Sequence, residues 1–278
     1  MFARPAWPYD SYRIFWRLVE LSGFEQVPLV AIDLSQEAFY IISPPNGELD
    51  GAMMAARARL IGPKRSRAAV WDLERRDGWA GAEHPDESMA ARDVSGFLAS
   101  VDYAWTFDPH YATYDERLVR VTVGGHPELA EQPPSPEKRW DACHFSYVNG
   151  RREAVMAALR SRHMIAPETW GPERPLILSA SRSMVYIHQT PFPVGSPLRF
   201  ALAAAHSLPL MAEAMENPYP MEAGWDFEAA PYGGFADAFS DWLPRTSPEM
   251  GSRLHKKLCV DFTFRKCVED GVRRSLWA

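Results

Sequence analysis

Two adjacent arginines stand where a helix is predicted to begin, in the stretch HFSYVNGRREAVMAALRSR at residues 144–162. An apolar, β-prone run ends at Tyr147, and a short Asn-Gly turn separates it from Arg151, Arg152 and a helix-forming run. Positive charge at this end opposes the helix dipole, which favours anions there. The pair is therefore either a solvated surface pair or part of an anion site, most often for phosphate, made by helix N–H groups and guanidinium groups.

Polar residues also follow a later predicted strand. The run SMVYIHQT is predicted to be a strand that ends with His188 and Gln189. Because ligands of open α/β sheets bind beyond the carboxyl ends of strands, His188 is either a ligand contact or a buried histidine bonded to the backbone. In VGGHPEL, His126 follows two glycines where the first half of the chain passes to the second. A catalytic role for His126 stands beside that of a simple hinge loop.

Short β-prone runs alternate with helical runs, as in the strands RAAVWDL and WDACHFSY and the helices DESMAARDVSGFLASV and SPLRFALAAAHS. This alternation is typical of a mostly parallel sheet covered by helices, the α/β class. The proline-rich stretch 126–140 lacks apolar periodicity and predicts a linker. We therefore expect one domain over 1–125 and a second over 141–278 with closing C-terminal helices. Only MFARP precedes the first predicted helix, so the first strand is expected to be very short or missing.

The composition, with 278 residues, 46% hydrophobic and 24% charged, is typical of a soluble globular protein. A net charge of −6 does not suggest an indiscriminate nucleic-acid binder, although seven Lys/Arg against three acids give residues 252–274 a local charge of +4. No apolar run approaches the roughly 20 residues of a membrane span, and the N-terminus has no apolar signal core. Three scattered cysteines argue against disulfides and zinc. We expect a cytoplasmic protein without an evident obligate protein partner.

Two stretches, SYVNGRR and SPLRFALAAAHSLPLMAE, resemble the GT-B glycosyltransferases, in particular the small bacterial and bacteriophage enzymes of the spore-maturation-like group. The resemblance covers most of the chain in layout and implies two Rossmann-like β/α domains that face a cleft. In this family the second domain binds a nucleotide-sugar, and Gly150, Arg151 and Arg152 match a Gly-Arg pair near its diphosphate. Arg199, the alanines after it and Pro209 match the segment that caps the ribose and diphosphate.

The resemblance implies a set of residues in contact with the sugar donor, and UDP is the first guess for its nucleotide. This set is Tyr147, Asn149, Gly150, Arg151, Arg152, His188, Gln189, Arg199 and Glu213. One position departs from the family, because many relatives carry a Glu for the ribose hydroxyls where this chain has Leu202. Glu213, at the end of the following predicted strand, is the candidate to take over that role.

The chain has no Asp-x-Asp pair of the kind that metal-dependent glycosyltransferases use. Arginines would then neutralise the diphosphate as the glycosidic bond breaks, so we expect neither a metal nor a cofactor. An inverting reaction also needs a general base for the acceptor hydroxyl, and Asp72, Glu74 and His126 are the candidates. A retaining reaction needs no such base. Salt bridges to the arginines that follow Glu74 are the structural alternative for the two carboxylates.

The acceptor is suggested by the resemblance alone. Small enzymes of this kind occur in bacteriophages, where they glycosylate hydroxymethylated pyrimidines in DNA. The local charge of +4 and an aromatic-rich first half fit such an acceptor. Two other interpretations stay open: a non-catalytic nucleotide-sugar-binding protein of the same fold, favoured by Leu202, and a sugar-nucleotide epimerase of the same two-domain architecture.

Overall fold

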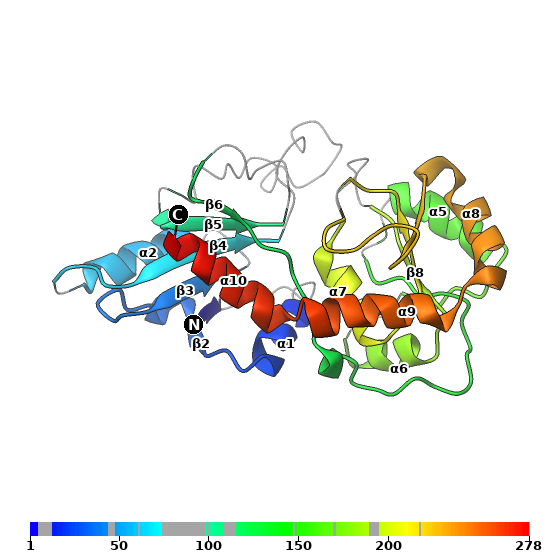
Figure 1. Ribbon diagram of the computed structural model, residues 1–278, viewed down its shortest axis with the longest axis horizontal. Helices are drawn as coiled ribbons and strands as arrows, with labels where there is room; N and C mark the ends of the chain where they lie inside the picture. The colour runs from blue at the N-terminus through cyan, green and yellow to red at the C-terminus, as the bar shows by residue number, and fades with distance from the viewer. Residues whose placement is uncertain are drawn as a thin grey trace. The chain divides into compact units, whose positions relative to one another are not determined.

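The chain forms two compact units in a computed structural model (Figure 1). Unit 1 comprises Met1–Val123 and Arg265–Ala278, and unit 2 comprises Gly124–Phe264. The structure describes residues 1–4, 13–43, 48–60, 62–73, 98, 100–107, 115–146, 148, 150–168, 171–188, 195–216 and 218–277. Among the helices of these residues, none combines the length and the apolarity that crossing a membrane requires.

Unit 1 is built on a six-stranded sheet in the order β2-β1-β3-β4-β5-β6, and every neighbouring pair is parallel. The strands are β1 (Phe2–Arg4), β2 (Gln26–Pro28), β3 (Phe39–Ile42), β4 (Arg67–Asp72), β5 (Tyr103–Thr106) and β6 (Leu118–Arg120). The helices are α1 (Arg13–Leu21), the 3-10 turn η2 (Leu29–Ala31), α2 (Glu48–Ala58) and α10 (Phe264–Trp277). β4 is buried from Ala68 onward, as expected for a strand that is covered on both faces.

Aromatic side chains fill one part of the unit 1 core. Phe15 lies edge-on to Phe2 and to Trp71, with ring centroids 5.8 and 5.5 Å apart, and Trp71 lies edge-on to Trp105 at 5.4 Å. The indole N–H of Trp105 donates to Ser275 Oγ at 2.9 Å, which ties β5 to α10 across 170 residues of sequence. This bond satisfies the polar group of an otherwise apolar buried side chain.

Unit 2 contains a three-stranded parallel sheet in the order β7-β8-β9. Its strands are β7 (Met184–Tyr186), β8 (Leu210–Glu213) and β9 (Glu228–Ala230). Isolated parallel bridges extend this sheet beyond β7, because Cys143 pairs with Met184 and Ala142 pairs with Ile165. The sheet thus has five strand positions, which lie side by side in the order Ile165, Ala142–Cys143, β7, β8 and β9. Numbered along the chain, this order is 2-1-3-4-5, the same as that of the first five strands of unit 1.

Helices and short turns complete unit 2. They are η3 (Pro127–Leu129), α5 (Gly150–Arg160), η4 (Gly171–Glu173), α6 (Arg174–Ser179), α7 (Pro197–Ala205), η5 (Tyr232–Gly234), α8 (Phe235–Trp242), η6 (Leu243–Arg245), α9 (Pro248–His255) and the π-helical segment η7 (Lys256–Asp261). α5 and α8 pack side by side (Figure 1). Every residue of α7 is buried, which agrees with a sequence that is apolar and alanine-rich apart from Arg199.

Two glycines at the start of unit 2 allow a close approach of two backbone segments. A Cβ on Gly124 would lie 1.9 Å from the carbonyl oxygen of Phe262, so this position excludes any side chain. The next residue, Gly125, donates its N–H to Leu258 O at 2.8 Å and accepts from Phe264 N–H at 2.9 Å. The first and last residues of unit 2 are therefore tied to each other by backbone hydrogen bonds.

The unit boundaries differ from the predicted domains at two places. The predicted linker 126–140 belongs to unit 2, where Ser135 N and Arg139 N donate to the carbonyls of Ser179 and Ala180 at 3.0 and 2.8 Å. The predicted second domain ran to residue 278, whereas Arg265–Ala278 belong to unit 1. The physical reason is the packing of α10 on β5, which the apolar pattern of a helix does not reveal.

Several predicted elements also differ in extent. The first strand, expected to be very short or missing, exists as the three residues of β1. The predicted strand WDACHFSY occurs only as isolated bridges at Trp140, Ala142 and Cys143, because the His144 side chain takes up the next carbonyl of the ladder, Val185 O, at 3.1 Å. β2 and β9 were not predicted, and most of the helix expected in DESMAARDVSGFLASV lies outside the described residues.

Candidate functional site

Arg151 and Arg152 lie in the first turn of α5. This helix follows the Ala142–Cys143 segment, which forms parallel bridges with its neighbours in the sheet. This segment is the first in the chain order of the unit 2 sheet, and it has the Ile165 segment on one side and β7 on the other. Open α/β sheets bind ligands beyond the carboxyl ends of the strands at such a reversal of strand order. The sheet topology therefore places Arg151 and Arg152 at the expected binding position of unit 2.

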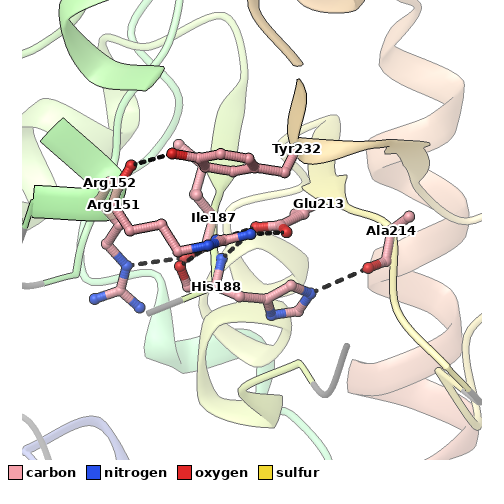
Figure 2. A network of polar contacts seen from close by, with 7 residues as sticks. All are labelled: Arg151, Arg152, Ile187, His188, Glu213, Ala214 and Tyr232. Carbon is pink, nitrogen blue, oxygen red and sulfur yellow. Dashed lines mark hydrogen bonds and ion pairs between the residues drawn. The ribbon is translucent and has the colours of Figure 1, made fainter. Parts of the chain in front are cut away.

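Arg151 is fixed by a carboxylate and an aromatic ring (Figure 2). Its guanidinium group binds both carboxylate oxygens of Glu213, with Nη1 2.7 Å from Oε2, and donates to His188 O at 2.9 Å. The Arg151 guanidinium carbon lies 3.8 Å from the centre of the Tyr232 ring, and the Tyr232 hydroxyl donates to Arg151 O at 2.9 Å. Two residues predicted to contact a sugar donor, Arg151 and Glu213, are thus partners of each other.

Arg152 and Arg199 are more deeply buried than Arg151. Arg152, which is 5% exposed, donates from Nε to Ile187 O at 2.9 Å. Burial lowers the pKa of the Arg152 guanidinium, and a neighbouring positive charge, Arg151, lowers it further. Arg199, from α7, donates from Nε to Ser146 Oγ at 3.1 Å. Helices α5 and α7 therefore bring three arginines to the carboxyl ends of neighbouring strands.

Two buried histidines lie among these arginines and are neutral at neutral pH. His188 follows β7, donates its backbone N–H to Glu213 Oε2 at 3.0 Å, and has Nε2 3.3 Å from Ala214 O (Figure 2). Burial lowers the pKa of His188 against the opposing effect of Glu213. Burial and the nearby Arg152 lower the pKa of His144 to about 3. Neither imidazole adds positive charge to the site.

Among the described residues, the site brings three arginines together with two carboxylates. Glu213 pairs with Arg151, and Glu168 attracts Arg152. Buried charges are retained only where partners compensate for their desolvation, and guanidinium groups bind phosphate oxygens through paired N–H donors. The arrangement therefore has the chemistry of a site for a phosphate-bearing anion.

The other predicted site residues are placed as follows. Gly150 is exposed at the start of α5, and Leu202 is 3% exposed within α7, so no carboxylate occupies its position. Glu74, Tyr147, Asn149 and Gln189 lie outside the described residues. The predictions for all four stay predictions.

The two described candidates for a general base fall in different units. Asp72 ends β4 in unit 1 and is 3% exposed. His126 lies in unit 2, where its Nδ1 accepts the Glu128 backbone N–H at 3.2 Å and caps the turn η3. This cap gives His126 a structural role in the loop, which was the alternative to a catalytic one.

Sequence reasoning gave no role to three residues that shape the site: His144, Ser146 and Tyr232. His144 and Ser146 lie directly before the Asn-Gly turn, so a polar pair at the end of a β-prone run was the available signal. Tyr232 is 81 residues from Arg151 in the chain, and no local sequence pattern predicts their contact. Within the described ranges, no group of three or more His, Cys, Asp or Glu side chains is placed to hold a metal ion.

The fold is similar to several solved structures at low sequence identity. The chain matches TarM with a TM-score of 0.58 and 10% identity over 87% of its own length, and it spans only 56% of TarM. It matches HepE from Anabaena, solved in complex with UDP and glucose, with a TM-score of 0.60 and 9% identity over 94% of this chain and 80% of that one. It matches an alpha1,3-fucosyltransferase solved with GDP with a TM-score of 0.51 and 11% identity over 100% and 89% of the two chains.

No protein-family model matches the sequence, and no curated protein matches it. The structural neighbours are GT-B glycosyltransferases, so the chain has the GT-B fold, and the predicted fold class of two Rossmann-like β/α domains is confirmed. The narrower resemblance to the spore-maturation-like group stays a prediction. At 9–11% identity these neighbours establish the fold and not the reaction.

Proposed function

We propose that the chain is a glycosyltransferase that moves a sugar from a nucleotide-diphosphate-sugar, first of all a UDP-sugar, to an acceptor hydroxyl. One observation carries the proposal: the buried arginines Arg152 and Arg199, with Arg151 beside them, lie at the reversal of strand order in unit 2 of a GT-B fold. That position is where an α/β sheet binds its ligand, and the excess charge suits a diphosphate. HepE was solved with UDP, and the fucosyltransferase with GDP.

The proposed reaction breaks the bond between the anomeric carbon and the diphosphate oxygen. The electron pair stays on the diphosphate, and fixed positive groups that already face this oxygen stabilise the growing charge without rearrangement. Arg152 and Arg199 would neutralise the diphosphate in this way, and no metal is required. Arg151, which Glu213 and Tyr232 hold in place, would orient the same end of the ligand.

The acceptor oxygen forms the new bond to the anomeric carbon and loses its proton. In an inverting reaction Asp72, the buried carboxylate that ends β4, is our candidate to accept that proton. We propose hydroxymethylated pyrimidine in DNA as the first acceptor to test, in the cytoplasm of a bacterium or a phage-infected cell. The support for it is the local charge of +4 over residues 252–274.

Binding of the sugar donor is tested by thermal shift and calorimetry with UDP, GDP, UDP-glucose and GDP-fucose. A ligand that binds only the native state must raise the melting temperature. We expect Arg152→Met to weaken nucleotide binding roughly 10- to 100-fold. Arg160→Met is the matched control, since Arg160 ends the same helix with a 40% exposed side chain. Equal affinity in the two variants would overturn the phosphate role of Arg152.

Turnover is tested separately with Asp72→Asn. We expect transfer to fall by about a hundredfold or more while UDP affinity stays unchanged, because Asp72 belongs to unit 1. Unchanged turnover would remove Asp72 as the base and favour a retaining reaction.

Product analysis by mass spectrometry distinguishes the two rival functions. A transferase releases free nucleotide and a glycosylated acceptor, whereas an epimerase leaves the nucleotide-sugar bond intact. The observation that favours a non-catalytic binding protein is Leu202, whose apolar side chain is buried where relatives carry a Glu. Such a protein would bind the nucleotide-sugar and consume none of it, either with water or with an acceptor.

A further inference from the structure

The hydrogen-bond pattern of His188 determines which ring nitrogen carries the proton. Nε2 of His188 lies 3.3 Å from the carbonyl oxygen of Ala214. A carbonyl oxygen only accepts hydrogen bonds, so Nε2 carries the hydrogen. Burial lowers the pKa of His188, so the imidazole holds a single proton at neutral pH. Nδ1 is therefore an unprotonated nitrogen whose lone pair can only accept.

This acceptor has no hydrogen-bond donor among the residues that the structure describes. His188 is 2% exposed, and Nδ1 itself is buried without a partner. A buried polar atom left unsatisfied destabilises a protein, so each such atom calls for a physical explanation.

The His188 ring is held rigidly at the site of the arginines. Its backbone N–H is bonded to Glu213, and Glu213 is bonded in turn to Arg151. The ring also lies edge-on to Tyr186, with ring centroids 5.2 Å apart. Figure 2 shows the Nδ1 edge of the ring turned away from the Arg151–Glu213 pair. His188 therefore presents a fixed acceptor just beyond the carboxyl end of β7, next to the site of the arginines.

The chemistry of this acceptor excludes one ligand group and selects another. A phosphate oxygen carries lone pairs and is repelled by the lone pair of Nδ1, so His188 does not bind the diphosphate as the arginines would. A hydroxyl group supplies the missing hydrogen. Arginines together with a buried, unpartnered acceptor fit a ligand in which a hydroxyl group lies close to a phosphate group.

We propose that His188 Nδ1 accepts a hydrogen bond from a hydroxyl group of the nucleotide-sugar and so selects the ligand by a hydroxyl as well as by its charge. This inference rests on the proposed function. A nucleotide-sugar offers two sources of the hydroxyl: the ribose, which the nucleotide alone also contains, and the transferred sugar.

Two substitutions of His188 test the roles of Nδ1 and Nε2 separately. His188→Asn places an acceptor oxygen near Nδ1 and loses the bond to Ala214, whereas His188→Gln keeps an N–H near Nε2 and loses the acceptor. We expect His188→Gln to weaken binding of UDP-glucose or GDP-fucose roughly three- to tenfold, and His188→Asn to weaken it less. A purely structural histidine gives the opposite order, because only the Gln variant keeps the contact with Ala214.

The choice of ligand identifies the source of the hydroxyl. If the ribose supplies it, His188→Gln weakens UDP and UDP-glucose equally, and 2′-deoxy- or 3′-deoxy-UDP binds wild type and variant alike. If the transferred sugar supplies it, UDP binding is unaffected and only UDP-glucose is weakened. Nitrogen NMR of labelled histidine gives a second measurement, in which ligand binding must shift the Nδ1 resonance of His188.

The failures of the two proposals are distinguishable. If wild type binds nucleotide-sugars and His188→Gln binds them equally tightly, with no shift at Nδ1, the inference about His188 is overturned and the proposed function stands. If wild type binds none of the four ligands, both proposals fall. Circular dichroism of each variant establishes that it has folded.

Discussion

Unit 1 and unit 2 wind five parallel strand positions in the same order but bury different charges. Among the described residues, Asp72 is the single buried charged side chain of unit 1. Unit 2 buries three arginines, Arg152, Arg174 and Arg199, together with the carboxylates Glu213 and Asp226. The shared winding therefore gives both sheets the same reversal of strand order, while the residues after each strand determine the charge found there.

Two neighbouring arginines of unit 2, the buried Arg152 and the partly exposed Arg151, donate to backbone carbonyls at the end of a strand. Ile187 O accepts from Arg152, and His188 O accepts from Arg151. These carbonyls lie just beyond β7, where the ladder ends and its acceptors are unused. The same edge that binds ligands in such folds is thus also the edge that can solvate a buried guanidinium group.

Acid should lower the stability of unit 2 more than that of unit 1, because the buried histidines belong to unit 2. This difference is the largest effect that we expect between the two units. Burial lowers the pKa of His144 from its ordinary 6.5 to about 3 and that of His206 to about 4. Each stabilises the fold fully above pH 6.5, and this contribution is lost as the pH falls toward the folded-state pKa. At pH 5 the two together should destabilise unit 2 by about 4 kcal/mol.

Hydrogen exchange by mass spectrometry at pH 7 and 5, corrected for the intrinsic rates, measures each unit through its own peptides. The described residues of unit 1 contain no histidine, so its protection should fall much less. His144→Asn keeps an N–H for Val185 O and should reduce the pH effect in unit 2. Equal losses in the two units would contradict the assignment of acid sensitivity to unit 2.

Matched glycines on two C-terminal helices compare how tightly each unit packs. In unit 2, a Cβ on Gly251 would lie 2.0 Å from Ser207 O, and a backbone cannot move aside cheaply. In unit 1, a Cβ on Gly271 would meet side chains, at 2.9 Å from Val121 Cγ2 and 3.0 Å from Trp105. We expect Gly251→Ala to lower the free energy of unfolding by about 3 kcal/mol and Gly271→Ala by about 1 kcal/mol, measured with urea. Comparable effects would show that α9 can shift on α7.

Arg199→Lys tests whether charge alone defines the site in unit 2. Lysine keeps the positive charge but loses the planar group that contacts Ser146. UDP affinity, measured by calorimetry, should fall by roughly tenfold. Arg182→Lys is the control, because the Arg182 side chain is 60% exposed. Unchanged affinity in Arg199→Lys would mean that the site needs only a net charge.

The smallest expected effect concerns the attachment of α10 to unit 1. Ser275→Ala leaves the buried N–H of Trp105 without its acceptor and should lower the free energy of unfolding by about 1–2 kcal/mol. Ser252→Ala in unit 2 is a close control, since both hydroxyls donate to the carbonyl four residues earlier but Ser252 is exposed. Equal urea midpoints for the two variants would mean that the Trp105 bond adds no stability.

Local signals predicted part of the site and could not predict the rest. The Asn-Gly turn before Arg151 correctly located the start of α5, and the run ending at His188 located β7, because turn residues and apolar runs act over a few residues. The ion pair of Arg151 with Glu213 joins residues 62 apart, so only the folded sheet reveals it. The assignment of α10 to unit 1 depends likewise on Trp105, far away in the sequence.

The return of the chain to unit 1 sets an order of folding during synthesis. A ribosome completes all of Gly124–Phe264 before it adds Arg265–Ala278, so unit 2 has its whole sequence while unit 1 still lacks α10. Until then the indole N–H of Trp105 has no Ser275 to bind. Unit 2 can therefore fold while the chain is being made, and unit 1 reaches its final state only after α10 has been made.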